Sequence, residues 1–127
     1  MRTIEELRVQ NNALEKSYEY QRIIPEVMKE VYTQFVNKSI EQEEKWLETD
    51  TWDDPFGDDP ESMKISTSKR IEEAKRLLPS NPEQAAELFM QLGSCHTLWA
   101  LQKRILKEKY DITWYTPAEL NPDVKFD

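Results

Sequence analysis

Apolar residues recur near the start of the chain at alternating intervals of three and four positions. They are Ile4, Leu7, Leu14 and Tyr18, with Asn11 in the remaining place. This interval predicts one face of an α-helix, and Thr3 with Glu6 has the sequence pattern of a capping box at its start. The asparagine resembles the polar residue that fixes register between paired helices. Residues 4–18 are therefore either the seam of a homodimer or a face packed within the chain.

A proline interrupts the next apolar pattern. Pro25 lacks an N–H and disfavours helix at the residue before it, so the first helix should end near residue 23 or kink there. The second helix then begins at Pro25 and carries the apolar residues Met28, Val31, Tyr32, Phe35, Val36, Ile40 and Leu47. One straight helix over 3–48 would be about 68 Å long. This length is too great for a compact globule of this size, whose radius of gyration is about 14 Å. A sharp kink or turn near Pro25 is expected.

Two further helices are predicted in the second half of the chain. Ser66 or Thr67 opens the first of them, which ends before Pro79. Asn81 followed by Pro82 is a strong start signal for the second, because asparagine caps a helix and proline suits its first position. Apolar residues continue at helical spacing as far as Tyr110, and Gly93 with Ser94 is the place in this run where a helix would be interrupted.

The end of the chain has a different pattern. Residues 112–127 are expected to form an extended tail, in which Thr116 and Glu119 give a second capping box for one short helical turn. The fold class predicted over residues 1–127 is all-α: a single-domain bundle of about four helices, with a kink or turn near Pro25 and a short C-terminal helical turn.

Composition removes several classes of function. The 127 residues include 2 glycines, 1 cysteine and 1 histidine. Phosphate-cradling and dinucleotide-binding loops need several nearby glycines, and paired-cysteine zinc sites and internal disulfides need a second cysteine. No apolar run approaches the roughly 20 residues of a membrane span. A cytoplasmic protein without a cofactor is expected, with no membrane as a partner.

The negative charge is concentrated in one segment. The formal net charge is −8, and the stretch 46–63 contains seven acidic residues and no lysine or arginine. Proline and glycine in this stretch predict a loop over 46–65. The rest of the chain is close to neutral. Nucleic acid is not an expected partner, because a chain of this charge is repelled by phosphate.

The acidic loop is the strongest candidate for a binding site. Aspartates and aromatic residues together favour docking of a protein with a basic surface, because aromatic residues are enriched among interface anchors. The candidate partner-binding residues are Asp50, Trp52, Asp53, Asp54, Phe56, Asp58, Asp59 and Glu61. The predicted function is a non-enzymatic interaction or regulatory module of the adaptor, inhibitor or immunity type.

The alternative function is a small all-α metal-dependent hydrolase that uses helix carboxylates. Glu41, Glu44 and Glu48 are spaced to share one helix face, and Glu108 with Asp111 repeats the interval of three. This arrangement resembles the paired acidic Mg²⁺ ligands of all-α nucleoside triphosphate pyrophosphohydrolases, although there the second pair follows more closely.

Other catalytic arrangements find little support. His96 is the sole imidazole, so Ser-His or Cys-His chemistry would have to use it. It falls on an apolar stripe and is expected to be a core histidine, and its neighbour Cys95 is expected to be a small buried apolar residue. No catalytic residue and no metal ligand is predicted.

Overall fold

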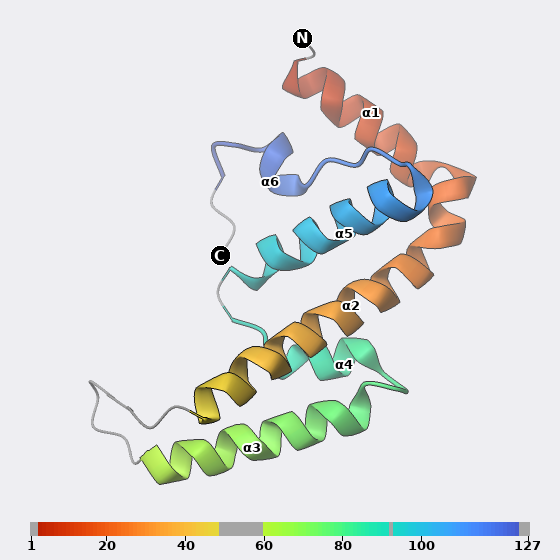
Figure 1. Cartoon of the computed structure of the whole chain (residues 1–127). Coiled ribbons are helices and arrows are strands. Elements are labelled where there is room, and N and C mark those ends of the chain that lie inside the picture. Colours follow the sequence, from red (N-terminus) through yellow and green to blue (C-terminus); the bar gives the residue numbers. More distant parts are fainter. Residues whose placement is uncertain (1–2, 49–59, 92, 125–127) are drawn as a thin grey trace. The chain divides into compact units, whose positions relative to one another are not determined.

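The computed structural model of the chain describes residues 3–48, 60–91 and 93–124 (Figure 1). The all-α prediction is confirmed: the described residues form helices and no strands. The six helices are α1 (Ile4–Lys16), α2 (Tyr18–Leu47), α3 (Pro60–Leu77), α4 (Pro82–Glu87), α5 (Ser94–Tyr110) and α6 (Pro117–Leu120). Within the described ranges, no helix combines the length and apolarity that crossing a membrane requires. The chain divides into two compact units, 1–31 with 91–127 as unit 1 and 32–90 as unit 2.

The core of unit 1 joins the first half of α2 to α5 and to the segment after it. Its buried residues are Tyr20, Ile23, Val27, Val31, Ile105, Leu106 and Trp114. One polar contact crosses this core: the buried Gln102 amide donates to the Tyr20 hydroxyl at 3.0 Å. Burial, together with the charge of Glu15, raises the pKa of Tyr20, and the hydrogen bond from Gln102 opposes that shift. Tyr20 is therefore a neutral hydrogen-bonding partner at physiological pH.

The first helix ends at Lys16 with Ser17 as its cap, so the predicted helix end or turn near Pro25 lies at Ser17 instead. The Ser17 hydroxyl donates to the Leu14 carbonyl at 2.6 Å and accepts from the Tyr20 amide at 3.2 Å. One side chain thus ends α1 and caps α2. Pro25 lies inside α2, where it removes a hydrogen bond at a cost of about 3 kcal/mol. Burial of Ile23 and Val27 on either side of it opposes that cost.

The C-terminal segment 112–124 is bound to α1 by side chains acting on its backbone. The buried Asn11 accepts from the Tyr115 amide at 2.9 Å and donates to the Tyr115 carbonyl at 3.2 Å. Arg8 donates to the Leu120 carbonyl at 2.9 Å, and α6 lies next to α1 (Figure 1). Of the seam predicted over residues 4–18, Asn11 and Leu14 make contacts within the chain, whereas Ile4 and Tyr18 are exposed.

The predicted helical turn in this segment is present as α6. Thr116 and Glu119 form both halves of the capping box. Lys103 of α5 donates to both Glu119 carboxylate oxygens at 2.7 Å and lies 5.4 Å from the centroid of the Tyr115 ring. These contacts attach the segment to α5 as well as to α1.

Unit 2 contains the second half of α2 with α3 and α4. Its buried apolar residues are Phe35, Val36, Ile40, Ile71, Ala74, Ala85, Ala86 and Phe89. The start signal at Asn81 is confirmed, since the Asn81 side chain accepts from the Gln84 amide at 3.1 Å. α3 begins at Pro60, not at Ser66 or Thr67, because proline is well suited to a first helical turn. Residues 46–47 and 60–65 of the predicted loop are therefore helical, and residues 49–59 of it lie outside the described part of the chain.

The long fourth helix of the prediction is two helices, α4 and α5. Gly93 precedes α5 with a φ of 85°. This left-handed conformation is open to glycine but rarely adopted by other residues. The position predicted to interrupt the helix is therefore where α5 begins. Leu92 lies outside the described residues.

Replacing Asn11 by alanine is expected to destabilise unit 1 by about 1–3 kcal/mol, because the Tyr115 amide and carbonyl lose their partner where water has little access. Urea denaturation followed by circular dichroism measures the change. The exposed neighbour Asn12 supplies the control: Asn12→Ala should change stability by less than about 0.5 kcal/mol. Equal effects of the two substitutions would contradict the role given to Asn11.

The Lys103–Glu119 pair predicts a pH dependence. Burial raises the pKa of Glu119, but hydrogen bonds from Lys103 and Thr116 outweigh it and hold that pKa below the ordinary value of 4.5. The stabilisation is therefore present above about pH 4.5 and disappears as the pH falls through the lowered pKa. Glu119→Gln should cost stability at neutral pH and progressively less in acid. Denaturation midpoints across the pH range measure this, with the exposed Glu19→Gln as control; a deficit that is constant with pH would refute it.

Candidate functional site

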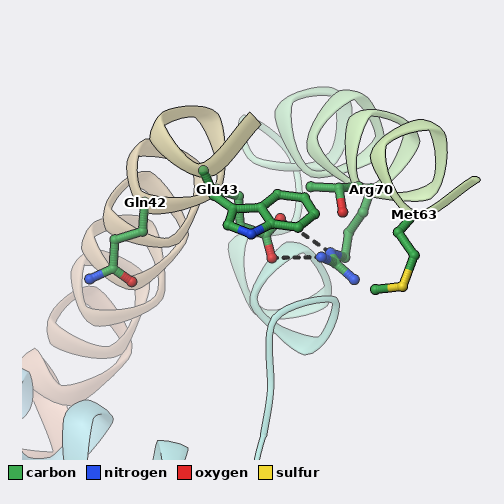
Figure 2. Close-up of a pocket in the computed structure, with 6 residues that line it drawn as sticks. Gln42, Glu43, Met63 and Arg70 are labelled. Carbon is green, nitrogen blue, oxygen red and sulfur yellow. Dashed lines mark hydrogen bonds and ion pairs between the residues drawn. The ribbon is translucent and has the colours of Figure 1, made fainter. Parts of the chain in front are cut away.

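A pocket of about 260 Å³ lies in unit 2, between the C-terminal part of α2 and the N-terminal part of α3. Its lining residues are Gln42, Glu43, Trp46, Met63, Thr67 and Arg70. On each helix these residues are spaced so that they share one face. Figure 2 shows Glu43 and Arg70 facing each other across the pocket, with Met63 extending from α3 beside Arg70. The two helices thus form opposite walls.

Arg70 organises the interior of the pocket. Its Nε and Nη2 atoms donate to the two carboxylate oxygens of Glu43 at 3.3 and 2.6 Å (Figure 2). The guanidinium carbon also lies 5.8 Å from the centroid of the Phe89 ring. A forked ion pair fixes both distance and orientation, and stacking on an aromatic ring adds a cation–π attraction. Arg70 therefore connects α3 to α2 and to the residue that follows the α4 cap.

The remaining walls combine apolar surface with one buried hydroxyl. The Met63 residue is 38% exposed, and Thr67 is 5% exposed. Tryptophan, methionine and arginine are among the residues enriched in protein interfaces. Because Glu43 and Arg70 neutralise each other, the described lining carries no net charge. The pocket therefore presents a partly apolar surface with an internal ion pair.

Most of the predicted partner-binding residues lie outside the described part of the chain. These are Asp50, Trp52, Asp53, Asp54, Phe56, Asp58 and Asp59. Glu61 is in the first turn of α3, and its side chain also lies outside the description. The segment 48–59 connects the helix ends that supply Trp46 and Met63. In the chain, the pocket therefore adjoins both ends of the acidic segment.

Three of the five helix carboxylates proposed for a metal site form ion pairs with lysines. Lys45 pairs with Glu41 at 3.4 Å, Lys75 with Glu44 at 3.3 Å, and Lys107 with Asp111 at 3.1 Å. Among the residues that the structure describes, no group of three or more histidine, cysteine, aspartate or glutamate side chains is placed to hold a metal ion.

The prediction that His96 is a core residue is wrong. Its side chain is exposed and makes an edge contact with Trp99, with ring centroids 5.5 Å apart. The prediction assumed one helix from Pro82 to Tyr110, but the break before Gly93 changes the face that His96 occupies. Cys95, expected to be buried, is half-buried.

The sequence contains part of the signal for the pocket residues. Met63, Thr67 and Arg70 follow spacings of four and three, and Glu43 with Trp46 is spaced by three. These intervals indicate shared helix faces, but the pairing of Glu43 with Arg70 depends on how the two helices pack. Comparison of the chain with protein-family models, with curated proteins and with solved structures gives no match.

Replacing Arg70 by alanine is expected to destabilise the protein by about 1–2 kcal/mol, because the partly buried Glu43 carboxylate loses its partner. Glu43→Gln combined with Arg70→Met should cost less than the sum of the single substitutions. Denaturation midpoints provide the comparison.

Arg76 supplies the control, because its pair with Glu73 lies within α3 and is exposed. Arg76→Ala should leave the midpoint nearly unchanged. If Arg70→Ala and Arg76→Ala had the same denaturation midpoint, the claim that Arg70 stabilises the packing of α3 against α2 would be wrong.

Proposed function

We infer that the chain is a cytoplasmic protein-interaction or regulatory module, of the adaptor, inhibitor or immunity type. Its binding face consists of the acidic, aromatic-bearing segment and the pocket that adjoins this segment in the chain. The partner is a protein with a basic surface. A single cysteine and the lack of a long apolar run in the sequence support a cytoplasmic location.

The observation that carries this proposal is the position of the pocket. Trp46 is next to the last residue of α2, and Met63 is in the first turns of α3. The sequence between them contains seven acidic residues and no basic residue. A partly apolar pocket beside a strongly charged segment has the composition of an interface, in which apolar anchors supply affinity and charges speed encounter and select partners.

The distribution of the other charges also supports this assignment. Several described carboxylates outside the segment pair with lysine or arginine, as Glu30 does with Lys109 and Glu44 with Lys75. Seven acidic residues and no basic residue lie in the stretch 46–63 of the sequence, so most of the −8 net charge belongs to this segment. A concentrated charge attracts a basic surface more strongly at low salt than at high salt.

The test is capture of the partner by the immobilised protein. Replacing Asp53, Asp54, Asp58 and Asp59 together by asparagine should abolish capture of the protein that wild type retains, and should leave the melting temperature nearly unchanged. The retained protein is identified by mass spectrometry, and its capture should weaken as salt is raised.

The matched control removes the same charge elsewhere. Its four substitutions are Glu19→Gln, Glu26→Gln, Glu108→Gln and Asp123→Asn, all at exposed positions in unit 1. This variant should retain the partner. If the segment variant captured the partner as well as wild type does, the acidic segment would not be part of the binding face.

A further inference from the structure

We propose that the pocket between α2 and α3 receives one large apolar side chain from a lysine- or arginine-rich segment of the partner. This inference rests on the proposed function and specifies the chemistry of the partner. It separates two roles: the pocket selects an anchor residue, and the acidic segment attracts the surrounding positive charge.

The size of the pocket favours a single side chain. Its volume of about 260 Å³ is below the range of roughly 300–1,000 Å³ that is usual for small-molecule and cofactor sites. Interface anchors are single large residues that fill such pockets and carry much of the binding energy. A side chain is therefore a better match for this space than a cofactor.

The lining suits an apolar anchor. Met63 supplies exposed apolar surface, and the pocket contains the indole of Trp46 in its wall. The Glu43 carboxylate already accepts two hydrogen bonds from Arg70, so the charges inside the pocket satisfy each other. An entering side chain meets apolar surface and a neutralised ion pair, and an incoming charge would have to compete with Arg70 or Glu43.

Charge complementarity identifies what surrounds the anchor. The sequence that joins the two walls carries seven negative charges, whereas the pocket lining carries a balanced pair. A partner segment that binds both the pocket and these charges is expected to be rich in lysine or arginine. Acidic segments are disfavoured by repulsion.

Two short lysine-rich peptides test the proposal, one with a central tryptophan and one with alanine in its place. Their dissociation constants are measured by fluorescence anisotropy at low salt. Wild type should bind the tryptophan peptide at least about tenfold more tightly, as expected for burial of a large side chain. A glutamate-rich peptide with the same tryptophan should not bind.

Met63→Ala removes a pocket wall at an exposed position, and Met90→Ala is its matched control. The two methionines are 38% and 39% exposed, and Met90 is not part of the pocket lining. Met63→Ala should reduce the advantage of the tryptophan peptide to less than about threefold, while Met90→Ala should preserve it. Unchanged melting temperatures verify that both variants are folded.

The acidic segment is tested separately with the same peptides. Neutralising Asp53, Asp54, Asp58 and Asp59 should weaken both lysine-rich peptides and preserve their ratio. If wild type binds the tryptophan and alanine peptides equally, the pocket assignment is overturned while the proposed function stands. If the neutralised variant binds both peptides as wild type does, the proposed function fails instead.

Two other occupants would also overturn the assignment. If the tryptophan peptide binds more tightly than the alanine peptide only after Trp52→Ala and Phe56→Ala, the chain's own aromatic residues occupy the pocket, and the assignment to a partner side chain is overturned. Self-association that Met63→Ala abolishes, measured by light scattering, would assign the pocket to a second copy of the chain.

Discussion

The guanidinium of Arg70 is shared between the Glu43 carboxylate of α2 and the aromatic ring of Phe89. Together with the Lys75–Glu44 ion pair, these two contacts join α3 to the other helices of unit 2. The ion pair sets the separation of the two helices at the pocket, and the ring contact connects α3 to the chain beyond α4. The shape of the candidate binding face therefore depends on one side chain.

The buried core of unit 2 and the pocket use different apolar residues. Ile40 and Ile71 are buried in unit 2, while Met63 remains partly exposed in the pocket. The apolar surface that holds the unit together is thus separate from the surface that we propose for a partner. The acidic segment joins the two pocket walls in the chain, so the charge and the pocket on which the proposal rests are adjacent in sequence.

Local signals in the sequence predicted the parts of the fold that depend on neighbouring residues. The side chains of Asn81 and Thr116 each accept a hydrogen bond from a backbone amide three residues further along the chain, and both caps were predicted correctly. Ser17 was missed because the break that it makes uses a single hydroxyl, whereas Pro25 gives a stronger signal that packing overrides. The pocket was missed because Glu43 and Arg70 are distant in sequence, and their contact depends on helix packing. The binding assignment of the acidic segment remains a prediction.

The central claim is that a partner binds the α2–α3 end of unit 2. Hydrogen–deuterium exchange of the protein, free and in complex with its captured partner, tests this directly. The account predicts slower exchange on binding at residues 42–47 and 60–70, with little change in α1, α5 and α6. Protection confined to the helices of unit 1, with residues 42–47 and 60–70 unaffected, would contradict it.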